Sequence, residues 1–250
     1  MKKLFIVLLL SLCLNSCKNV SQHLSEVSGE RISIDGSIEA DKEILEFIEP
    51  YKNHLNSTLD SALAYNPRAL TKNDGDLNSS LGNLMADALM LQVNPIFKKQ
   101  TGEEIDMVLL NHGGIRAELP AGNVTTRMVY QIMPFENMVV IAELSGSKMK
   151  EMLQYLSRAK TAHPVNGIEI EANSKYIIQS ARINGEEIRK DKTYFVATSD
   201  YLLTGGDNMK FFENPVSVHN TGYKIRNVLV DYFKAQDTIK SVVDNRYFRN

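Results

Sequence analysis

Between Leu109 and Arg116 the chain reads Leu-Leu-Asn-His-Gly-Gly-Ile-Arg, an apolar strand that breaks at a pair of glycines. Much later, between Tyr201 and Asp207, it reads Tyr-Leu-Leu-Thr-Gly-Gly-Asp, which has the same form. Glycine allows the backbone to approach a ligand closely, and each break delivers one strong polar side chain, that of Arg116 or that of Asp207. The two breaks together predict a nucleotide-binding pocket.

The start of the chain has the pattern of a bacterial export signal. Two lysines precede an apolar run, Leu4–Leu14, that is too short to span a bilayer. The sequence Leu-Asn-Ser before Cys17 resembles the lipobox of bacterial lipoproteins, which implies cleavage before Cys17 and its acylation. An ordinary signal peptide, with Cys17 present by accident, is the alternative. We predict a lipoprotein signal peptide over 1–16, a tether over 17–40, and a lipid-anchored protein of the cell envelope on its periplasmic or outer surface.

The cysteine count and the charge balance restrict the chemistry. Cys13 would leave with the leader and Cys17 would carry the lipid, so the mature domain has no thiol for a disulfide, a nucleophile or a zinc site. Without the two leader lysines, the 28 basic residues fall to about 26 against 30 acidic ones, a net charge near −4. A chain this acidic lacks the basic surface of a nucleic-acid-binding protein, and we expect no nucleic-acid partner.

The remaining residues, 41–250, are enough for one large domain or two small ones, and we predict one domain, in which helical and strand patterns are mixed. The predicted helices cover 41–61, 81–99, 146–156 and 222–233. The predicted strands cover 105–110, 137–144, 176–183 and 194–199. We expect a kink or a restart at Pro50 in the first helix, and a cap by Ser79 or Ser80 on the second. Because the elements follow no regular βαβ cadence, the pattern favours an α+β fold with mixed β-sheets flanked by helices.

Polar residues at the two glycine breaks are candidates for contact with a nucleotide. Asn111 follows a buried strand, and two glycines separate it from Ile115 and Arg116. A guanidinium at this place grips a phosphate, or the hydroxyls of a sugar, through two parallel hydrogen bonds. Asp207 can accept hydrogen bonds from both hydroxyls of a ribose, as acidic groups do in other nucleotide sites. A surface arginine after a glycine turn fits the spacing of Arg116 equally well.

Two aromatic residues stand at matching places in the sequence. Phe135 lies just before the strand predicted over 137–144, and Tyr201 lies shortly before the second glycine break. Two rings from separate segments can hold a flat heterocycle between them, and one base stacked on an aromatic side chain gains on the order of 1–3 kcal/mol. Packing in the core is the alternative for either ring, and for a single aromatic residue it is the more common role.

Four segments occur in a recognisable order and spacing. They are Leu81–Ala88 (Leu-Gly-Asn-Leu-Met-Ala-Asp-Ala), Asn111–Arg116, Met133–Phe135 together with Leu144–Gly146, and Leu203–Asp207. In this order they resemble the C-terminal domain of the 5'-nucleotidase family, the periplasmic and cell-surface enzymes that hydrolyse nucleotides and nucleotide sugars. Each segment alone is a weak signal, but four in register are specific, and they span nearly all of the chain from Asp41 onward.

The resemblance implies a domain that binds the nucleoside part of a substrate. In the family the base lies between two aromatic rings, which correspond to Phe135 and Tyr201. The asparagine and the arginine of the Asn-x-Gly-Gly-Ile-Arg loop contact substrate, and the aspartate of Gly-Gly-Asp holds the ribose hydroxyls. The implied substrate-binding residues are Asn111, Gly114, Arg116, Phe135, Tyr201 and Asp207.

The chain departs from the family pattern near the phosphate. Family members usually carry an arginine shortly before the Leu-Gly-Asn-Leu segment, where this chain has Asp-Leu-Asn at 76–78. One phosphate-facing cation is therefore missing, which leaves a nucleoside or a differently placed phosphate as the ligand, unless Lys72 or Arg68 substitutes. His112 stands where the family usually has a small residue.

The largest departure concerns catalysis. In the family an N-terminal metallophosphatase domain performs hydrolysis with two metal ions, held by Asp-x-His and Gly-Asn-His-Glu/Asp motifs. None of the five histidines of this chain lies in such a motif, so we assign it no catalytic residue, no metal ligand and no cofactor. We predict a nucleotide-recognising component of a 5'-nucleotidase-type phosphohydrolase, in which a separate metallophosphatase chain carries the divalent metals. The alternative is a non-catalytic, lipid-anchored nucleoside- or nucleotide-binding protein for scavenging or sensing.

Overall fold

The structure, a computed structural model, describes residues 24–250. The predicted signal peptide and the predicted lipidation site Cys17 lie outside the described residues. The chain divides into two units, one ending at Ile48 and the other spanning Glu49–Asn250. Residues 24–40 of the first unit form neither a helix nor a strand.

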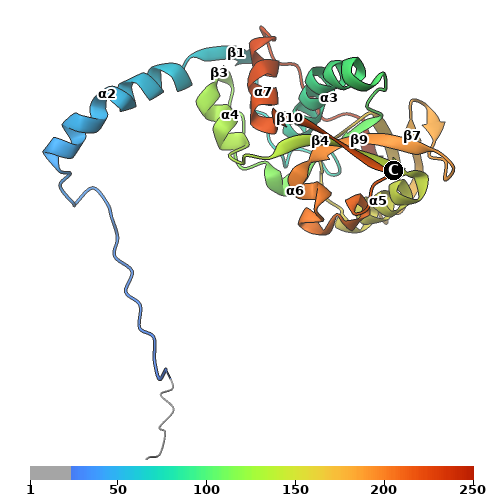
Figure 1. Cartoon of the computed structure of the whole chain (residues 1–250), viewed down its shortest axis with the longest axis horizontal. Helices are drawn as coiled ribbons and strands as arrows, with labels where there is room; N and C mark the ends of the chain where they lie inside the picture. Colours follow the sequence, from blue (N-terminus) through green and yellow to red (C-terminus); the bar gives the residue numbers. More distant parts are fainter. Residues whose placement is uncertain (1–23) are drawn as a thin grey trace, which may run out of the picture. The chain divides into compact units, whose positions relative to one another are not determined.

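Helix α2 (Lys42–Leu59) is labelled in Figure 1. At its start the Asp41 carboxylate accepts the backbone N–H groups of Glu43 and Ile44, at 2.9 and 3.1 Å, and so satisfies donors that have no partner inside the first turn. Pro50 lies inside the helix, which continues past it, so the predicted restart is wrong. The missing N–H costs one hydrogen bond without ending the helix. Within the described residues, no helix has the length and apolar character needed to cross a bilayer.

The second unit contains three β-sheets. The central sheet has the spatial order β10 (Ser217–Lys224), β4 (Met138–Ser145), β9 (Thr193–Ser199), β2 (Met107–Leu109) and β5 (Val165–Asn166). The second sheet has the order β11 (Tyr247–Arg249), β6 (Ile168–Ala172), β7 (Ile178–Ile183) and β8 (Glu186–Glu187). A small third sheet pairs β1 (Ala62–Asn66) with β3 (Gly122–Thr125). The pairs β2–β9 and β11–β6 are parallel and the other strand pairs antiparallel, so the sheets are mixed.

Helices pack around these sheets. After α2 they are α3 (Ser80–Thr101), α4 (Thr126–Ile132), α5 (Gly146–Ala159), α6 (Asp200–Leu203) and α7 (Ile225–Lys234). Three short 3-10 helices are η1 (His112–Gly114), η2 (Gly206–Asn208) and η3 (Lys210–Phe212). Helix α3 packs against α7, β2 and β5, whereas α5 packs against β4 and β7 (Figure 1). Mixed sheets flanked by helices confirm the predicted α+β fold.

Strand alternation separates two apolar cores on opposite faces of the central sheet. Successive residues of a strand point to opposite faces. On β4, Val139 and Ile141 join the core that contains α3 and α7, whereas Ala142 and Leu144 join the core that contains α5 and the second sheet. Strands β2 and β9 divide their residues in the same way. Because both faces are covered, the central sheet is a rigid support for the loops at its edges.

The sequence located most of these elements. Confirmed to within a few residues are the predicted helices at 81–99 and 146–156 and the predicted strands at 137–144, 176–183 and 194–199. Ser79 is the cap of α3, since its Oγ accepts the N–H of Gly82 at 3.2 Å. The strand predicted at 105–110 is limited to three residues. The helix predicted at 222–233 begins only at Ile225, because the preceding residues up to Lys224 pair with β4.

A buried polar network fixes the C-terminal segment against the start of α3. Asn83 donates from Nδ2 to the Oδ1 of Asn78 and to the carbonyl of Val242, both at 2.8 Å. Asn78 in turn donates to the carbonyls of Asp244 and Tyr247, at 2.9 and 2.8 Å. The two asparagines are only 3% and 1% exposed, and their Nδ2 groups donate to protein acceptors instead of water, whereas Oδ1 of Asn83 is buried without a hydrogen-bond partner among the described residues.

Arg246 extends this network to the middle of α3. Its guanidinium pairs with the carboxylates of Asp87, at 2.6 Å, and Asp244, at 2.8 Å, and donates to the carbonyl of Val165 at 2.8 Å. We refer to Asn78, Asn83, Asp87, Asp244 and Arg246 as the C-terminal network. Asn83, the asparagine of the Leu-Gly-Asn-Leu segment, thus has a structural role, because it links α3 to the C-terminal segment.

Candidate functional site

Three loops meet at one edge of the central sheet because of the strand directions. Strands β2 and β9 are parallel neighbours, so their carboxyl ends lie at the same edge. Strand β4 is antiparallel to β9, with Val139 opposite Ser199, so its amino end lies there too. The segments next to these three strand ends carry Asn111, Phe135 and Tyr201, the last on the short helix α6. The carboxyl ends of parallel strands are the usual place for a ligand in open sheets.

The loop after β2 requires glycine to place its polar side chains. A Cβ atom on Gly114 would lie 2.8 Å from Oδ1 of Asn111, so any side chain there would displace the asparagine. Arg116 donates from Nη1 to the carbonyl of Gly113 at 3.1 Å, which holds the exposed guanidinium against its own loop. This loop therefore presents Asn111 and Arg116 together.

The loop after β9 places an aromatic ring and a carboxylate. Gly205 and Asp207 adopt positive φ angles of 84° and 52°, a region that glycine favours and aspartate tolerates. A Cβ atom on Gly206 would lie 2.6 Å from the ring of Tyr201, so a residue without a side chain allows the ring to pack on the loop. The glycine pair thus brings Tyr201 and Asp207 side by side.

These loops enclose a cavity of about 380 Å³. It is lined by Asn111, Gly113, Gly114, Arg116, Phe135, Asn137, Tyr201 and Asp207. All six residues that the sequence assigns to substrate binding are among them. The volume falls within the range of roughly 300–1,000 Å³ that small-molecule sites occupy. The structure therefore brings the predicted residues together, while their contact with a ligand stays a prediction.

The two aromatic rings at this cavity are not part of the core. Phe135 is 40% exposed and Tyr201 is 44% exposed, although both are large apolar side chains. Core packing, which was the alternative reading of each ring, is therefore wrong for both. Exposed rings from two separate loops at one cavity are suited to stacking on a flat ligand.

A hydrogen-bond network joins the loops at Asp207. Its Oδ2 accepts from Nδ2 of Asn111 at 2.7 Å, and its Oδ1 accepts from the hydroxyl of Tyr201 at 2.9 Å. The hydroxyl of Tyr155, on α5, donates to the main-chain carbonyl of Asp207 at 3.0 Å. Burial, and then the negative charge of Asp207, raise the pKa of Tyr155, so this hydroxyl stays a donor at neutral pH. We refer to Asn111, Tyr155, Tyr201 and Asp207 as the pocket network.

A buried histidine supports the first loop from behind. His163 is 5% exposed, and its Nδ1 accepts the backbone N–H of His112 at 3.2 Å. Burial, with a further contribution from His112, lowers the pKa of His163 to about 4. The ring is therefore neutral at physiological pH, with its proton on Nε2. The His112 ring lies 3.2 Å from the carbonyl of Ala162 through Nδ1, so the histidine at the family's small position also anchors the loop.

The structure distinguishes the two cations that were considered for the phosphate. Leu77, in the segment 76–78 near which the family usually carries an arginine, is a buried core residue. Lys72 donates from Nζ to the carbonyl of Ile115 at 2.8 Å, directly beside Arg116 in the chain. Arg68 instead donates to a main-chain carbonyl of the C-terminal segment at 2.5 Å. Of the two cations, Lys72 is the one bonded to the loop that carries Arg116, and neither Lys72 nor Arg68 lines the cavity.

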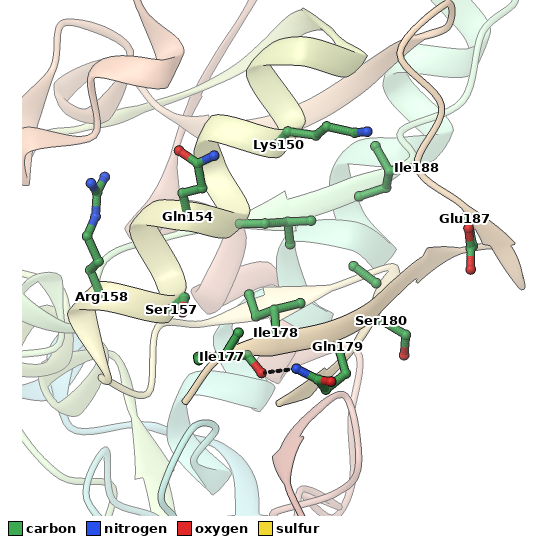
Figure 2. A pocket seen from close by; sticks show the side chains of 12 residues that line it. Lys150, Gln154, Ser157, Arg158, Ile177, Ile178, Gln179, Ser180, Glu187 and Ile188 are labelled. Carbon is green, nitrogen blue, oxygen red and sulfur yellow. Dashed lines mark hydrogen bonds between the residues drawn. The ribbon is translucent and has the colours of Figure 1, made fainter. Parts of the chain in front are cut away.

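A larger hollow, of about 610 Å³, lies between α5 and β7 (Figure 2). Figure 2 shows Lys150, Gln154 and Arg158 on the helix, with Lys150 directed toward Ile188, and Ile177 and Ile178 on the strand side of the hollow. None of the predicted residues lines it. We regard the smaller cavity as the candidate site, because aromatic, cationic and anionic groups converge there from three loops.

The donors of a dinuclear metal centre are not found in the part of the chain that the structure describes. Among residues 24–250, no group of three or more His, Cys, Asp or Glu side chains could hold a metal ion. His112 and His163 take part in the support of the loop, and His219 bonds with Gln100 at 2.7 Å. These residues do not fit the two-metal chemistry of a phosphatase.

The sequence missed several residues of the site. Gly113 and Asn137 line the cavity but are not among the predicted residues. Gly113 lies inside the segment Asn111–Arg116, and Asn137 lies two residues after Phe135, so both stand in or beside segments with predicted site residues. No pattern in the sequence indicates a role at the site for Tyr155 or His163. Their roles depend on contacts with residues about fifty positions away, which no local pattern records.

Comparisons with known proteins agree with the fold and the loop motifs. The model of the 5'-nucleotidase C-terminal domain family matches residues 58–214, more than half of the chain. A 5'-nucleotidase of Vibrio vulnificus is 29% identical over 231 residues, which cover 86% of this chain and 38% of that protein. Protein UshA of Escherichia coli is 26% identical over 215 residues, which cover 82% of this chain and 36% of that protein.

A solved structure shares the fold. The crystal structure of a 5'-nucleotidase precursor from Thermus thermophilus superposes with a TM-score of 0.69 at 20% identity, over 82% of this chain and 42% of that one. This chain spans about two fifths of the length of the relatives that it matches.

Proposed function

The chain belongs to the 5'-nucleotidase C-terminal domain family, and we propose that its cavity at the edge of the central sheet binds the nucleoside part of a nucleotide. One observation carries this proposal. Two exposed rings, a guanidinium and a carboxylate, delivered by three loops, surround a single cavity of about 380 Å³. The two rings suit a base, the carboxylate suits the hydroxyls of a ribose, and the guanidinium suits a phosphate.

In the proposed complex the base stacks between Phe135 and Tyr201. Asp207 accepts hydrogen bonds from the ribose hydroxyls, and Asn111 contacts the ligand beside it. Arg116 lies at the phosphate end, where its fork of donors suits an oxyanion. Lys72, held on the same loop, is the second positive charge at this end.

Isothermal titration calorimetry tests this proposal directly. The chain without its leader is titrated with adenosine, AMP and UDP-glucose, and we expect saturable binding of at least one of them. Ribose 5-phosphate, which lacks a base, is the matched control and should bind far more weakly, because it cannot stack. Absence of binding by all three nucleoside ligands would reject the proposal.

We further propose that the chain is the recognition component of a phosphohydrolase whose metals and catalytic groups belong to a separate metallophosphatase chain. Two observations support this division of labour. The chain matches the C-terminal domain of the family, and the described residues do not fit a dinuclear metal centre. AMP hydrolysis with a divalent metal should be negligible for the chain alone and should rise when an exported metallophosphatase is added. Robust hydrolysis by the purified chain alone would contradict the division. Binding without any effect of a partner would favour a non-catalytic role in scavenging or sensing.

We also propose that the protein is exported and anchored in the cell envelope through Cys17. The support is the apolar leader followed by Leu-Asn-Ser-Cys in the sequence. Metabolic labelling with a fatty acid should mark the wild-type protein and leave Cys17→Ser unlabelled. Cys13→Ser is the matched control, since that residue lies inside the leader. Equal labelling of Cys17→Ser and wild type would exclude the anchor.

A further inference from the structure

The carboxylate that is proposed to hold the ribose already has two donors from the protein. The hydroxyl of Tyr201 donates to Oδ1 of Asp207 at 2.9 Å, and Nδ2 of Asn111 donates to Oδ2 at 2.7 Å. The Tyr201 hydroxyl also accepts the backbone N–H of Asp207 at 3.2 Å. Tyr201 and Asp207 thus form a small hydrogen-bonded ring, which includes the carboxylate that is proposed to bind the ribose hydroxyls.

We infer that the Tyr201 hydroxyl competes with the ligand's sugar hydroxyls for Asp207, and that the Tyr201–Asp207 bond opens when a ribonucleoside binds. This inference rests on the proposed function of the cavity. A vicinal diol directs two donors at a carboxylate, and each oxygen of Asp207 already accepts one side-chain donor of the protein, so each sugar hydroxyl would have to share its acceptor oxygen with a protein donor. Tyr201 therefore has two opposed roles, because its ring favours binding of the base and its hydroxyl opposes binding of the sugar.

The packing of the loop indicates which partner moves. The main chain of Asp207 is held by the Tyr155 hydroxyl on its carbonyl, at 3.0 Å, and its φ of 52° lies in a narrow allowed region. The Tyr201 side chain, in contrast, is 44% exposed and rests on Gly206, which carries no side chain to trap it. A small displacement of the Tyr201 hydroxyl is therefore easier than a displacement of the Asp207 backbone.

Competition and cooperation predict opposite effects of the same substitution. If the Tyr201 hydroxyl competes, Tyr201→Phe keeps the stacking ring and frees Oδ1, so the affinity for adenosine should rise. An intramolecular hydrogen bond of this kind is modest after exchange with water, so we expect a rise of about twofold to tenfold. If instead the hydroxyl helps to orient Asp207 in the complex, the same substitution should lower the affinity.

The experiment is calorimetric titration of wild type and Tyr201→Phe with adenosine and with 2',3'-dideoxyadenosine. We expect the gain of Tyr201→Phe to be much smaller for the dideoxy ligand, because that ligand has no diol to direct at Asp207. Tyr155→Phe is the matched control, since it removes a hydroxyl bonded to the Asp207 carbonyl and should give no gain. In an Asp207→Asn background the effect of Tyr201→Phe should shrink, which a double-mutant cycle measures.

The outcomes separate this inference from the function on which it rests. If wild type binds adenosine and Tyr201→Phe binds it more weakly or equally, the competition is wrong and the nucleoside site stands. An equal gain for adenosine and the dideoxy ligand would also overturn the competition, because the effect would then come from the ring. If wild type binds no nucleoside, the proposed function itself fails.

Discussion

The C-terminal network and the pocket network are made of the same kinds of groups, yet their environments differ. In the C-terminal network, Asn78 and Asn83 are at most 3% exposed, and their Nδ2 groups donate to main-chain carbonyls and, from Asn83, also to Oδ1 of Asn78. In the pocket network, Tyr201 is 44% exposed, and its partner Asp207 lines a cavity. Polar groups that are closed off from solvent hold distant segments together, whereas the same groups at a cavity can exchange a protein partner for a ligand.

Burial explains this difference in energetic terms. A buried polar group whose partner is removed has no water to replace it and costs the fold its full desolvation free energy. At an open cavity water or ligand replaces a lost partner, so the effect on unfolding is small. Substitutions in the C-terminal network should therefore change stability without changing intrinsic affinity, and substitutions in the pocket network should do the reverse.

The largest expected effect is that of Arg246→Met on stability. This substitution leaves the carboxylates of Asp87 and Asp244 close together without their cation. Removing one partner of a buried ion pair costs about 3–5 kcal/mol, and we expect about 3 kcal/mol because both carboxylates are partly exposed. Urea denaturation measures the loss, and the Kd for adenosine at a temperature where the variant is folded should not change.

Arg189→Met is the matched control for Arg246→Met. Arg189 also forms an ion pair, with Asp191 at 2.5 Å, but both side chains are more than half exposed. Little change in the urea midpoint is expected, because exposed pairs contribute little. If Arg189→Met and Arg246→Met were equally destabilising, burial would not be the reason for the difference between the networks.

Asp207→Asn should show the reverse behaviour, a loss of binding with a preserved fold. Asparagine tolerates the positive φ at this position, so unfolding should change by less than about 0.5 kcal/mol. A hydrogen bond to a charged group is worth about 1.5–3 kcal/mol, so the Kd for adenosine should rise roughly 10- to 100-fold. Calorimetry and urea denaturation on the same sample measure both quantities. A large loss of stability with unchanged affinity would place Asp207 among the structural residues.

Phe135→Ala sharpens the comparison with an apolar group. Because the ring is 40% exposed, its removal should leave little cavity in the core and cost little stability. If it stacks on the base, binding should weaken by about 1–3 kcal/mol. Tyr65→Ala is the matched control, since Tyr65 is 50% exposed and does not line the cavity. Equal affinities of wild type and Phe135→Ala for adenosine would remove the ring from the site.

The sequence predicted the pocket better than it predicted the sheet that carries it. Glycine breaks and aromatic residues are local patterns, so they can be recognised in the sequence without the strand order that brings them together. Strand β10 was missed because Ser217–Lys224 has no fully buried residue. As an edge strand it has one neighbour in its sheet, so its sequence needs no apolar alternation. The predicted helix therefore extended too far toward Gly222.

The polar networks were the least predictable part. The sequence identified Asn83 only as part of the Leu-Gly-Asn-Leu segment and gave it no structural role. The carbonyl to which it donates belongs to Val242, far away in the sequence. Apolar spacing in α2 correctly predicted a helix, but spacing alone does not reveal that none of its residues is buried. Long-range polar pairing depends on the completed fold, which a single sequence does not record.

His163 shares one property with each network. It is buried, like the asparagines of the C-terminal network, and it supports a loop that lines the cavity. Its pKa is about 4 in the fold against an ordinary value of 6.5, so the unfolded chain takes up a proton first as the pH falls. The stabilisation from the neutral ring is complete above pH 6.5 and is lost as the pH falls toward 4. At pH 5.5 the loss of stability should be about 1 kcal/mol relative to pH 7.5.

The variant His163→Gln tests this prediction, because its side-chain oxygen can accept the His112 N–H but does not titrate. Between pH 7.5 and pH 5.5 its free energy of unfolding should fall by about 1 kcal/mol less than that of wild type. Urea denaturation at the two pH values measures this difference, and parallel losses in both proteins would show that His163 does not contribute to the acid sensitivity of the fold.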